Sequence, residues 1–314
     1  EQTIQQLLNI GKVPFFVGCT SGSTVRGSFD NLSDVVETTN KFQQHKIWVH
    51  VDGAWGGNCI FSDELRPLLS GLEACDSFTL NAHKMLGSTQ QCTAFLSRHS
   101  QILSRANSTN AGYLFHKSKH GANLDLGDGT FTCGRRGDAL KFWVLLQKYG
   151  AKGLGRRVQH SHRLCSQFSQ FLADSNNFLL TCAPQPLNIN FYYIPQSLLQ
   201  RYDITNANIR ELNARLIRGE RVDVHEEIGD AEFWTVVSKV SVQMKLKMHD
   251  RGLCMIPYQP SPTTCCTESK VHKNVKYLCL RLVLAGYRED FGTDDLRELI
   301  HIFEDTGRGL SNIK

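Results

Sequence analysis

Lys84 is the first residue whose type and position suggest chemistry. It follows His83, just beyond residues 76–80, an apolar segment typical of a buried strand. A lysine held in a cleft loses its proton more readily than one in water and can form a Schiff base with a carbonyl group. A His-Lys pair in a loop is more often simply solvated, so other residues must decide between the two interpretations.

Asp52 is the second such residue, because it ends the apolar segment 47–51. A carboxylate there could pair with a protonated ring nitrogen, as in enzymes that use pyridoxal 5′-phosphate (PLP) as an electron sink. Ala54, Gly56 and Gly57 are small, so a flat ring could lie against that turn. An Asp after a strand is also a common turn residue, and the argument therefore depends on Asp52 and Lys84 together.

The elements that must position these residues alternate between strands and helices. The patterns predict strands at residues 13–19, 47–51, 76–80 and 93–96, and helices at residues 31–44 and 62–69. Such alternation favours an α/β fold with a mostly parallel sheet and helices on its faces. Ligands bind beyond the carboxyl ends of the strands in these sheets, which is where Asp52, His83 and Lys84 fall.

The pattern changes near residue 145, where a second domain is expected to begin. The remaining strands are predicted at residues 188–194, 254–257 and 277–284. The remaining helices are predicted at residues 138–171, 206–217, 231–249 and 294–304. The first of these helices is expected in two pieces that meet near residues 150–155. This mixture predicts a smaller α+β domain over residues 145–314, after a first domain over residues 1–144. Two polar stretches, 218–230 and 261–273, are expected to be exposed insertions, and residues 107–136 a long surface loop of the kind that closes over active sites.

The composition excludes several classes of protein. Of 314 residues, 41% are hydrophobic and 21% charged, which excludes disordered, collagen-like and coiled-coil chains. The net charge of +5, from 35 Lys and Arg against 30 Asp and Glu, argues against a dedicated nucleic-acid-binding protein and is compatible with acidic small-molecule substrates. No apolar run is long enough to span a membrane.

The cysteines and the N-terminus indicate a reducing, cytoplasmic setting. Eleven Cys are too few for a disulfide scaffold, and no signal-peptide pattern precedes them, so the sequons at Asn31 and Asn107 carry little weight. Cys265, Cys266 and His272 are close in sequence but match no zinc spacing, which leaves metal binding a minor alternative. The chain begins with Glu1 inside a helix-like stretch, and we expect an N-terminal portion to precede it.

A family resemblance covers nearly the whole chain. WVHVDGAWGGNCIFSDELRPLLSGLEACDSFTLNAHKMLGSTQQC, residues 48–92, resembles the PLP-dependent group II amino-acid decarboxylases, in particular the glutamate and cysteine-sulfinate decarboxylase branch. The likeness extends to VPFFVGCTSGSTVRGSFD (13–30), AGYLFHK (111–117), CGRRGDALKFW (133–143), NINFYYIPQSL (188–198) and MIPYQP (255–260). It implies PLP fold type I, as in aspartate aminotransferase, a PLP cofactor, a small acidic amino-acid substrate and a homodimer that shares its active site.

The resemblance also implies roles for individual residues. Lys84 resembles the Schiff-base lysine, Asp52 resembles the partner of the pyridine nitrogen, and Ala54 resembles the residue packed against the ring. His83 resembles a phosphate contact, and Thr20 resembles a residue of the loop that approaches the cofactor. Arg281 resembles the arginine that binds a substrate carboxylate. The guanidinium group suits that last task, because it offers a carboxylate two parallel hydrogen bonds. A surface arginine at a strand end is the alternative.

One departure from the family concerns the catalytic loop, residues 113–128. Relatives carry an aromatic residue in its middle, where this chain reads Lys119-His120-Gly121-Ala122-Asn123. His120 could replace it as the general acid, since imidazole titrates near neutral pH, or could be a solvated loop residue. Two hypotheses follow: an active decarboxylase of glutamate, cysteine sulfinate or aspartate, and a catalytically weak or inactive paralogue that keeps the PLP-binding dimer scaffold.

Overall fold

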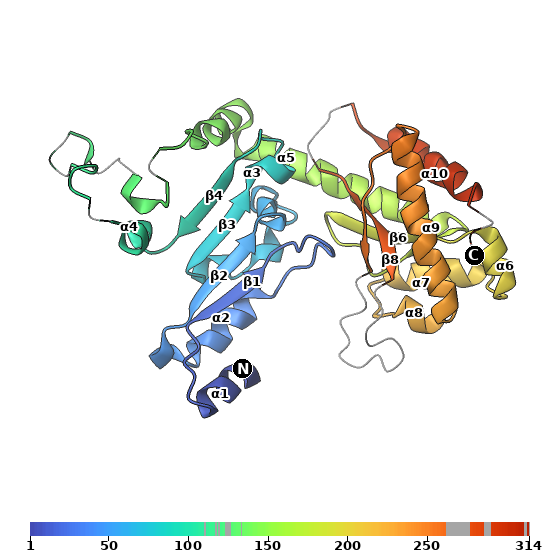
Figure 1. Ribbon diagram of the computed structural model, residues 1–314, viewed down its shortest axis with the longest axis horizontal. Helices are drawn as coiled ribbons and strands as arrows, with labels where there is room; N and C mark the ends of the chain where they lie inside the picture. The colour runs from blue at the N-terminus through green and yellow to red at the C-terminus, as the bar shows by residue number, and fades with distance from the viewer. Residues whose placement is uncertain are drawn as a thin grey trace. The chain divides into compact units, whose positions relative to one another are not determined.

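The computed structural model describes residues 1–109, 111–116, 118, 120–122, 127–132, 134–261, 277–285, 290–310 and 313 (Figure 1). They form two compact units. Unit 1 comprises Glu1–Ser21 and Phe29–Gly155, and unit 2 comprises Gly22–Ser28 and Arg156–Lys314. The short loop Gly22–Ser28 thus belongs to unit 2 although unit 1 flanks it in the sequence. The domain division expected near residue 145 remains a prediction.

Unit 1 contains a four-stranded sheet in the order β1-β2-β3-β4. Its strands are β1 (Phe16–Thr20), β2 (Trp48–Gly53), β3 (Ser77–Asn81) and β4 (Thr93–Ser97). The first three are parallel and β4 is antiparallel to β3. The predicted mostly parallel sheet is therefore confirmed, and the carboxyl ends of β1, β2 and β3 lie at the same edge.

One face of this sheet forms a small core with helix α2 (Leu32–Asn40), which Figure 1 shows beside β1 and β2. Val49, Val51 and Phe78 are buried there against Leu32. The helix begins where the sequence predicted, because the Asn31 side chain accepts a hydrogen bond from the third backbone N–H of the first turn.

The prediction of a helix at residues 62–69 is wrong. Only Arg66–Leu69 is helical, and as a 3₁₀ turn rather than an α-helix. Pro67 explains this, since it has no N–H to donate and its ring disfavours a preceding helical turn. The other helices of unit 1 are α1 (Gln2–Asn9), α3 (Ala82–Met85), α4 (Ile102–Asn107) and the first part of α5 (Ala139–Asp174).

Helix α5 is broken at Gly150, as the sequence predicted. Gly150 has φ 63° and ψ 172°, outside the helical region, so the helix consists of two pieces. A positive φ of this kind is readily adopted only by glycine.

Unit 2 contains an antiparallel sheet in the order β5-β6-β8-β7. Its strands are β5 (Phe178–Leu180), β6 (Asn188–Tyr193), β7 (Tyr258–Pro260) and β8 (Leu278–Val283), and its helices α6 (Gln196–Arg201), α7 (Asn206–Ile217), α8 (Val224–Glu227), α9 (Ala231–Asp250) and α10 (Thr293–Arg308). Helix α9 packs on β6 and β8. The strand predicted at 254–257 lies slightly later, as β7, and β5 was not predicted.

The polar stretch 218–230 is exposed over most of its length, as expected, but its centre enters the core. Val222, Val224 and His225 are buried. The imidazole of His225 is satisfied on both sides: Nε2 lies 2.9 Å from the Tyr192 hydroxyl, and Nδ1 lies 3.2 Å from Asp223 Oδ1. A polar sequence can therefore enter this core because its hydrogen bonds are made internally. The other predicted insertion, 261–273, lies outside the described residues except Ser261.

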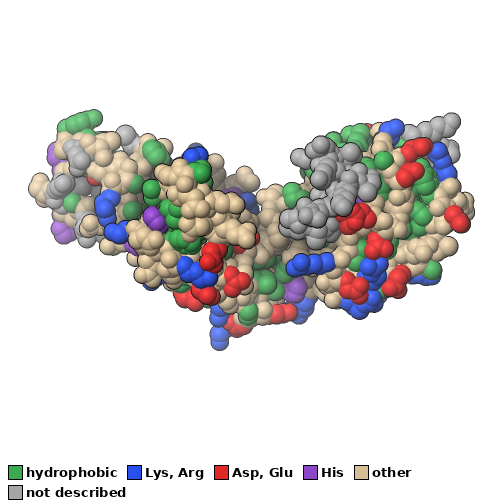
Figure 2. Space-filling view, turned by 90° about the horizontal axis from the view of Figure 1, so that it is seen from below, with side chains coloured by type: hydrophobic (Ala, Val, Ile, Leu, Met, Phe, Trp, Pro, Cys, Tyr) green, Lys and Arg blue, Asp and Glu red, His purple; other side chains and the backbone are tan. Residues whose placement is uncertain are grey.

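The surface carries charges of both signs. Lys and Arg side chains lie interspersed with Asp and Glu on the face shown in Figure 2, in keeping with the small net charge. Among the helices of the described residues, none is long and apolar enough to cross a membrane.

Candidate active site

The carboxyl edge of the unit 1 sheet brings together four of the residues singled out from the sequence. Thr20 ends β1 and is the direct register partner of Asp52 in β2, which in turn pairs with Thr79 of β3. Helix α3 follows β3 immediately and contains His83 and Lys84. Parallel pairing therefore brings these side chains to one edge, where α/β sheets bind ligands.

Asp52 is exposed and largely unused by the protein. Its Oδ1 accepts one hydrogen bond, at 3.0 Å, from the backbone N–H of Ala54. This short-range bond orients the carboxylate and shapes the turn that carries Ala54. Within the described ranges, Asp52 forms no ion pair, so the carboxylate is free to meet a cationic group.

Lys84 is partly buried, between the fully buried Ala82 and Met85. Its Nζ makes no hydrogen bond or ion pair with any residue that the structure describes. The position therefore suits an amine that reacts rather than one that stabilises the fold.

The turn after β2 is packed too closely for side chains. A Cβ at Gly53 would overlap the Phe78 ring and lie 2.9 Å from the Gly57 Cα. The Asn58 amide then donates to the carbonyls of Trp55 and Asn81, at 3.0 and 3.2 Å, which ties this turn to the end of β3. The surface beside Asp52 is therefore narrow and rigid.

His83 is held by one ring nitrogen. Its Nδ1 lies 3.1 Å from the backbone nitrogen of Cys92 and 2.9 Å from the Cys92 carbonyl oxygen, so one of these contacts is a hydrogen bond in either tautomer. In the part of the chain described, Nε2 has no partner. The imidazole is thus oriented by the protein while its outer nitrogen stays available.

Two buried polar atoms near this edge have no hydrogen-bond partner among the residues that the structure describes, and neither residue stood out in the sequence. They are the Ser21 hydroxyl and Asn58 Oδ1. The Ser21 backbone joins two strand ends, since its N–H donates to the Asp52 carbonyl at 2.8 Å and its carbonyl accepts from Gly56 at 3.0 Å. Serine and asparagine are common in loops, so only their burial marks them.

These groups fit PLP. The edge offers an unpaired amine, an unpaired carboxylate, an imidazole nitrogen without a partner and a buried hydroxyl without a partner, all beside a narrow glycine turn. An aldehyde, a pyridine nitrogen, a phosphate and a flat ring would each find a suitable group among them.

Arg281 lies in β8 of unit 2. Its Nη1 donates to the carbonyl of Thr24 at 2.6 Å, and its Nε is buried without a partner. Burial lowers the pKa of this guanidinium group, and no carboxylate of the described residues pairs with it. A buried, unused donor on a cation is suited to a carboxylate ligand.

The loop Gly22–Ser28 is anchored firmly within unit 2. Asn188 donates to the Thr24 carbonyl at 2.9 Å, and Asn190 donates to the Val25 carbonyl at 3.0 Å. Thr20 itself is fixed in unit 1 by Asp30, whose carboxylate accepts from the Thr20 N–H at 2.7 Å. The chain therefore passes from unit 1 to unit 2 between Ser21 and Gly22.

His120 is exposed, and no contact in the described structure joins it to Asp52, His83 or Lys84. Much of the predicted catalytic loop lies outside the described residues, as do Cys265, Cys266 and His272. The described end of this loop, near Asp128, is tied to α4. The Ser108 hydroxyl donates to the Asp128 carboxylate at 2.7 Å, and the Asn107 amide donates to the Gly129 carbonyl at 3.1 Å.

Comparison with known sequences gives a consistent family. Residues 1–194 match the pyridoxal-dependent decarboxylase conserved domain. The acidic amino acid decarboxylase GADL1 of Bos taurus is 34% identical over 262 residues, which are 83% of this chain and 45% of that protein. Human cysteine sulfinic acid decarboxylase is 35% identical over 255 residues, 81% of this chain and 46% of that protein. The chain spans somewhat less than half the length of these relatives.

Solved structures agree with this result. The apo form of mouse CSAD matches with a TM-score of 0.78 and 28% identity, covering 98% of this chain and 55% of that one. An Oryza sativa TDC structure with PLP and tryptamine has a TM-score of 0.74 at 19% identity and shares the fold. The predicted PLP fold type I is confirmed, and the chain belongs to the pyridoxal-dependent decarboxylase family.

Proposed function

We propose that this chain is the part of a PLP-dependent decarboxylase that converts a small acidic amino acid into the corresponding amine and CO2. The observation that carries the proposal is the unpaired Lys84 amine at the same sheet edge as the unpaired Asp52 carboxylate. PLP, when bound, supplies an electron sink for the electron pair left behind by the departing CO2.

The residues of the edge divide the task of holding PLP. Lys84 would hold PLP at its aldehyde carbon, with loss of water, and Asp52 would keep a proton on its ring nitrogen. Ala54 would lie against the PLP ring, while His83 and Thr20 would contact polar groups at the edge of the cofactor. The hydrogen bond from Ala54 to Asp52 and the contacts from Cys92 to His83 support these roles, because they orient both side chains before any ligand arrives.

Arg281 binds the carboxylate that distinguishes an acidic substrate. Its buried, unpartnered Nε supports this role, since a carboxylate would satisfy it. The names of the relatives support the substrate class: acidic amino acid decarboxylase, cysteine sulfinic acid decarboxylase and, in Metarhizium robertsii, L-aspartate decarboxylase dtxS4. Glutamate, cysteine sulfinate and aspartate are the candidates. His120 is the proposed general acid that returns a proton to the substrate carbon.

A homodimer in the cytoplasm completes the proposal. Leu140, Trp143 and Val144 lie at helical spacing on α5 and are exposed, Trp143 by 58%, which supports a second copy covering this face. All cysteines that the structure describes are free, which supports a reducing compartment.

The second candidate is a weak or inactive paralogue that retains PLP or only the scaffold. The loop sequence from Lys119 to Asn123 favours it, because that stretch has no aromatic residue. Restoring Tyr at Gly121 or Ala122 would raise turnover if delivery of the proton is the defect, and unchanged turnover would contradict that explanation.

The test is to incubate the complete protein with PLP, reduce it with borohydride and map the modified peptide by mass spectrometry. We expect the adduct on Lys84, and CO2 release from at least one of the three acidic substrates. An adduct without CO2 release favours the inactive paralogue. A folded protein without an adduct at Lys84 would overturn the cofactor assignment.

A further inference from the structure

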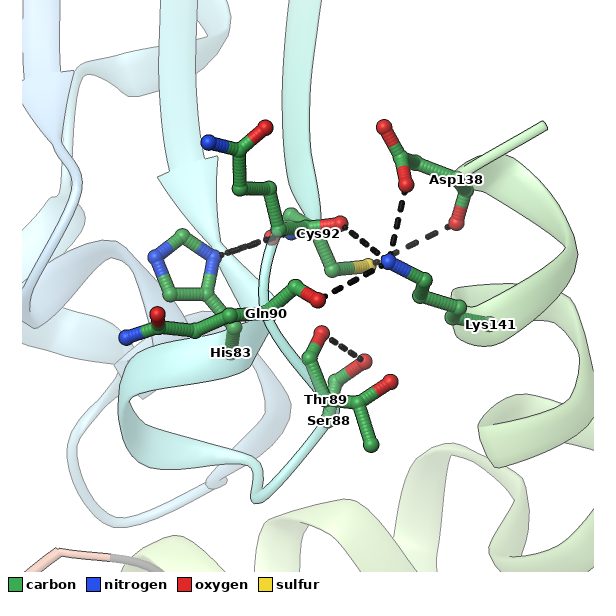
Figure 3. A network of polar contacts seen from close by, with 8 residues as sticks. His83, Ser88, Thr89, Gln90, Cys92, Asp138 and Lys141 are labelled. Atoms are coloured by element: carbon green, nitrogen blue, oxygen red, sulfur yellow. Dashed lines mark hydrogen bonds and ion pairs between the residues drawn. The ribbon is translucent and has the colours of Figure 1, made fainter. Parts of the chain in front are cut away.

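The turn after Lys84, residues 86–92, is tied to the start of helix α5 mainly by the Lys141 side chain, with a weaker contact from Cys92 Sγ to the Asp138 carbonyl at 3.9 Å (Figure 3). Lys141 Nζ donates to the backbone carbonyls of Gln90 and Gln91, each at 3.0 Å, and to Asp138 Oδ1 at 2.8 Å. An ammonium group has three hydrogens, so these three acceptors use all of its donors. Lys141 therefore acts as a clamp between two segments about fifty residues apart.

The clamped turn is the segment that orients His83. The Gln91 carbonyl belongs to the same peptide group as the Cys92 nitrogen, which lies 3.1 Å from His83 Nδ1. The His83 N–H also points to the Cys92 carbonyl, at 3.4 Å, and the Ser88 N–H donates to the Ala82 carbonyl at 3.2 Å. A short path of contacts therefore leads from Lys141 through Cys92 to His83, the neighbour of Lys84.

The charges strengthen this clamp. Side-chain exposure is 30% for Lys141 and 23% for Asp138, so water competes only partly. The hydrogen bond from Lys141 holds the pKa of Asp138 below its ordinary value, as expected when a cation stabilises the carboxylate. A charged donor also makes stronger hydrogen bonds to carbonyl oxygens than a neutral donor does.

Little of the fold depends on the clamp. Gln90 and Gln91 are exposed, so water would satisfy their carbonyls if Lys141 were lost. The buried residues at the two ends of the turn, Leu86 and Cys92, keep their packing without it. Loss of the clamp should therefore loosen the turn beside His83 while leaving overall stability nearly unchanged.

We propose that Lys141 is a positioning residue that acts through Cys92 on His83 and so prepares the sheet edge for PLP. This inference rests on the proposed function. It predicts that removing the charge loosens residues 86–92 and weakens PLP binding, whereas a conservative replacement restores both.

The experiment compares Lys141→Met, Lys141→Arg and Lys152→Met in the complete protein. Lys152 is an exposed lysine of the same helix without a described partner, so its replacement controls for loss of one charge. Hydrogen exchange of the Ser88 and Cys92 amides is measured without PLP, and the Kd of PLP is measured by fluorescence titration. For Lys141→Met we expect faster exchange of both amides and a Kd raised about tenfold, because PLP binding must then order the loosened turn at an entropic cost.

The outcomes separate the two proposals. Partial recovery in Lys141→Arg and wild-type values in Lys152→Met would support the clamp. If wild-type protein takes up PLP at Lys84 while Lys141→Met matches Lys152→Met in exchange and in Kd, the role of Lys141 is overturned and the proposed function stands. If wild-type protein takes up no PLP at Lys84, the proposed function is overturned, and the role of Lys141 in it falls as well.

Discussion

The two sheets of this protein use their residues in opposite ways. In unit 2, all residues of β6 are buried, and the Phe191 ring packs edge-on against Phe168 and Phe178. In unit 1, β2 alternates between the buried Val49 and Val51 and less buried residues, and its next-to-last residue is the exposed Asp52. The comparison teaches that stability and the candidate chemistry are concentrated in different sheets.

The aromatic residues of unit 1 sharpen the contrast. Phe16, His50 and Phe95 stack at centroid distances of 6.2 and 6.1 Å, yet Phe16 is 51% exposed and Phe95 is 42% exposed. Their counterparts in unit 2 are fully buried. Substitutions in unit 1 should therefore change function more than stability, and substitutions in unit 2 should do the reverse.

Replacing Lys84 gives the largest expected effect. In Lys84→Ala, CO2 release should fall by about a thousandfold or more if Lys84 carries the reaction. The free energy of unfolding should change by less than about 0.5 kcal/mol, since Lys84 makes no described hydrogen bond. Assays of CO2 release and urea denaturation check both values, with Lys152→Ala as the control. A strongly destabilised Lys84→Ala variant would contradict the proposal that function and stability depend on different sheets.

Replacing Phe191 tests the other side of the comparison. Phe191→Ala leaves a cavity in the unit 2 core and should cost about 3–5 kcal/mol of unfolding free energy. Phe16→Ala, at a half-exposed position in unit 1, should cost less than about 1 kcal/mol. Chemical denaturation of both variants measures the difference, and equal costs would show that the two sheets are packed alike.

Tyr192 tests whether polar contacts also stabilise the buried sheet. Burial raises the pKa of its hydroxyl well above the ordinary value, so Tyr192 stays neutral and hydrogen-bonded to His225. Tyr192→Phe should cost about 1–2 kcal/mol by leaving the imidazole with an unpaired nitrogen. Tyr258→Phe, at a partly exposed position, is the matched control and should change stability by less than about 0.5 kcal/mol.

The smallest effect concerns the pH dependence of unit 1. Because the Asp138 pKa lies below its ordinary value of 3.8 in the folded protein, the Lys141–Asp138 pair stabilises the fold above that pH. The contribution is lost as the pH falls through the depressed pKa. NMR titration of the Asp138 carboxyl should show a midpoint below 3.8 that moves upward in Lys141→Met. An unchanged midpoint would contradict the ion pair.

Local sequence was a good guide where an element contains its own signals. Helix α7 spans Asn206–Ile217, as predicted, because Thr205 and Asn208 form a capping box at its start. Glycine likewise marked the break in α5. Sequence was a poor guide where distant residues decide: His225 is buried within a mostly exposed polar stretch because Tyr192, some thirty residues away, completes its hydrogen bonds.

The same distinction holds at the candidate site. The sequence by itself determined that Asp52 and Lys84 follow neighbouring strands of a parallel sheet, since apolar runs and their polar ends are local features. Only the tertiary structure decided that Lys84 lacks a partner, that Cys92 orients His83, and that Lys141 holds the turn between them. These contacts join residues far apart in the chain, and their hydrogen bonds leave no mark on the local pattern of residue types.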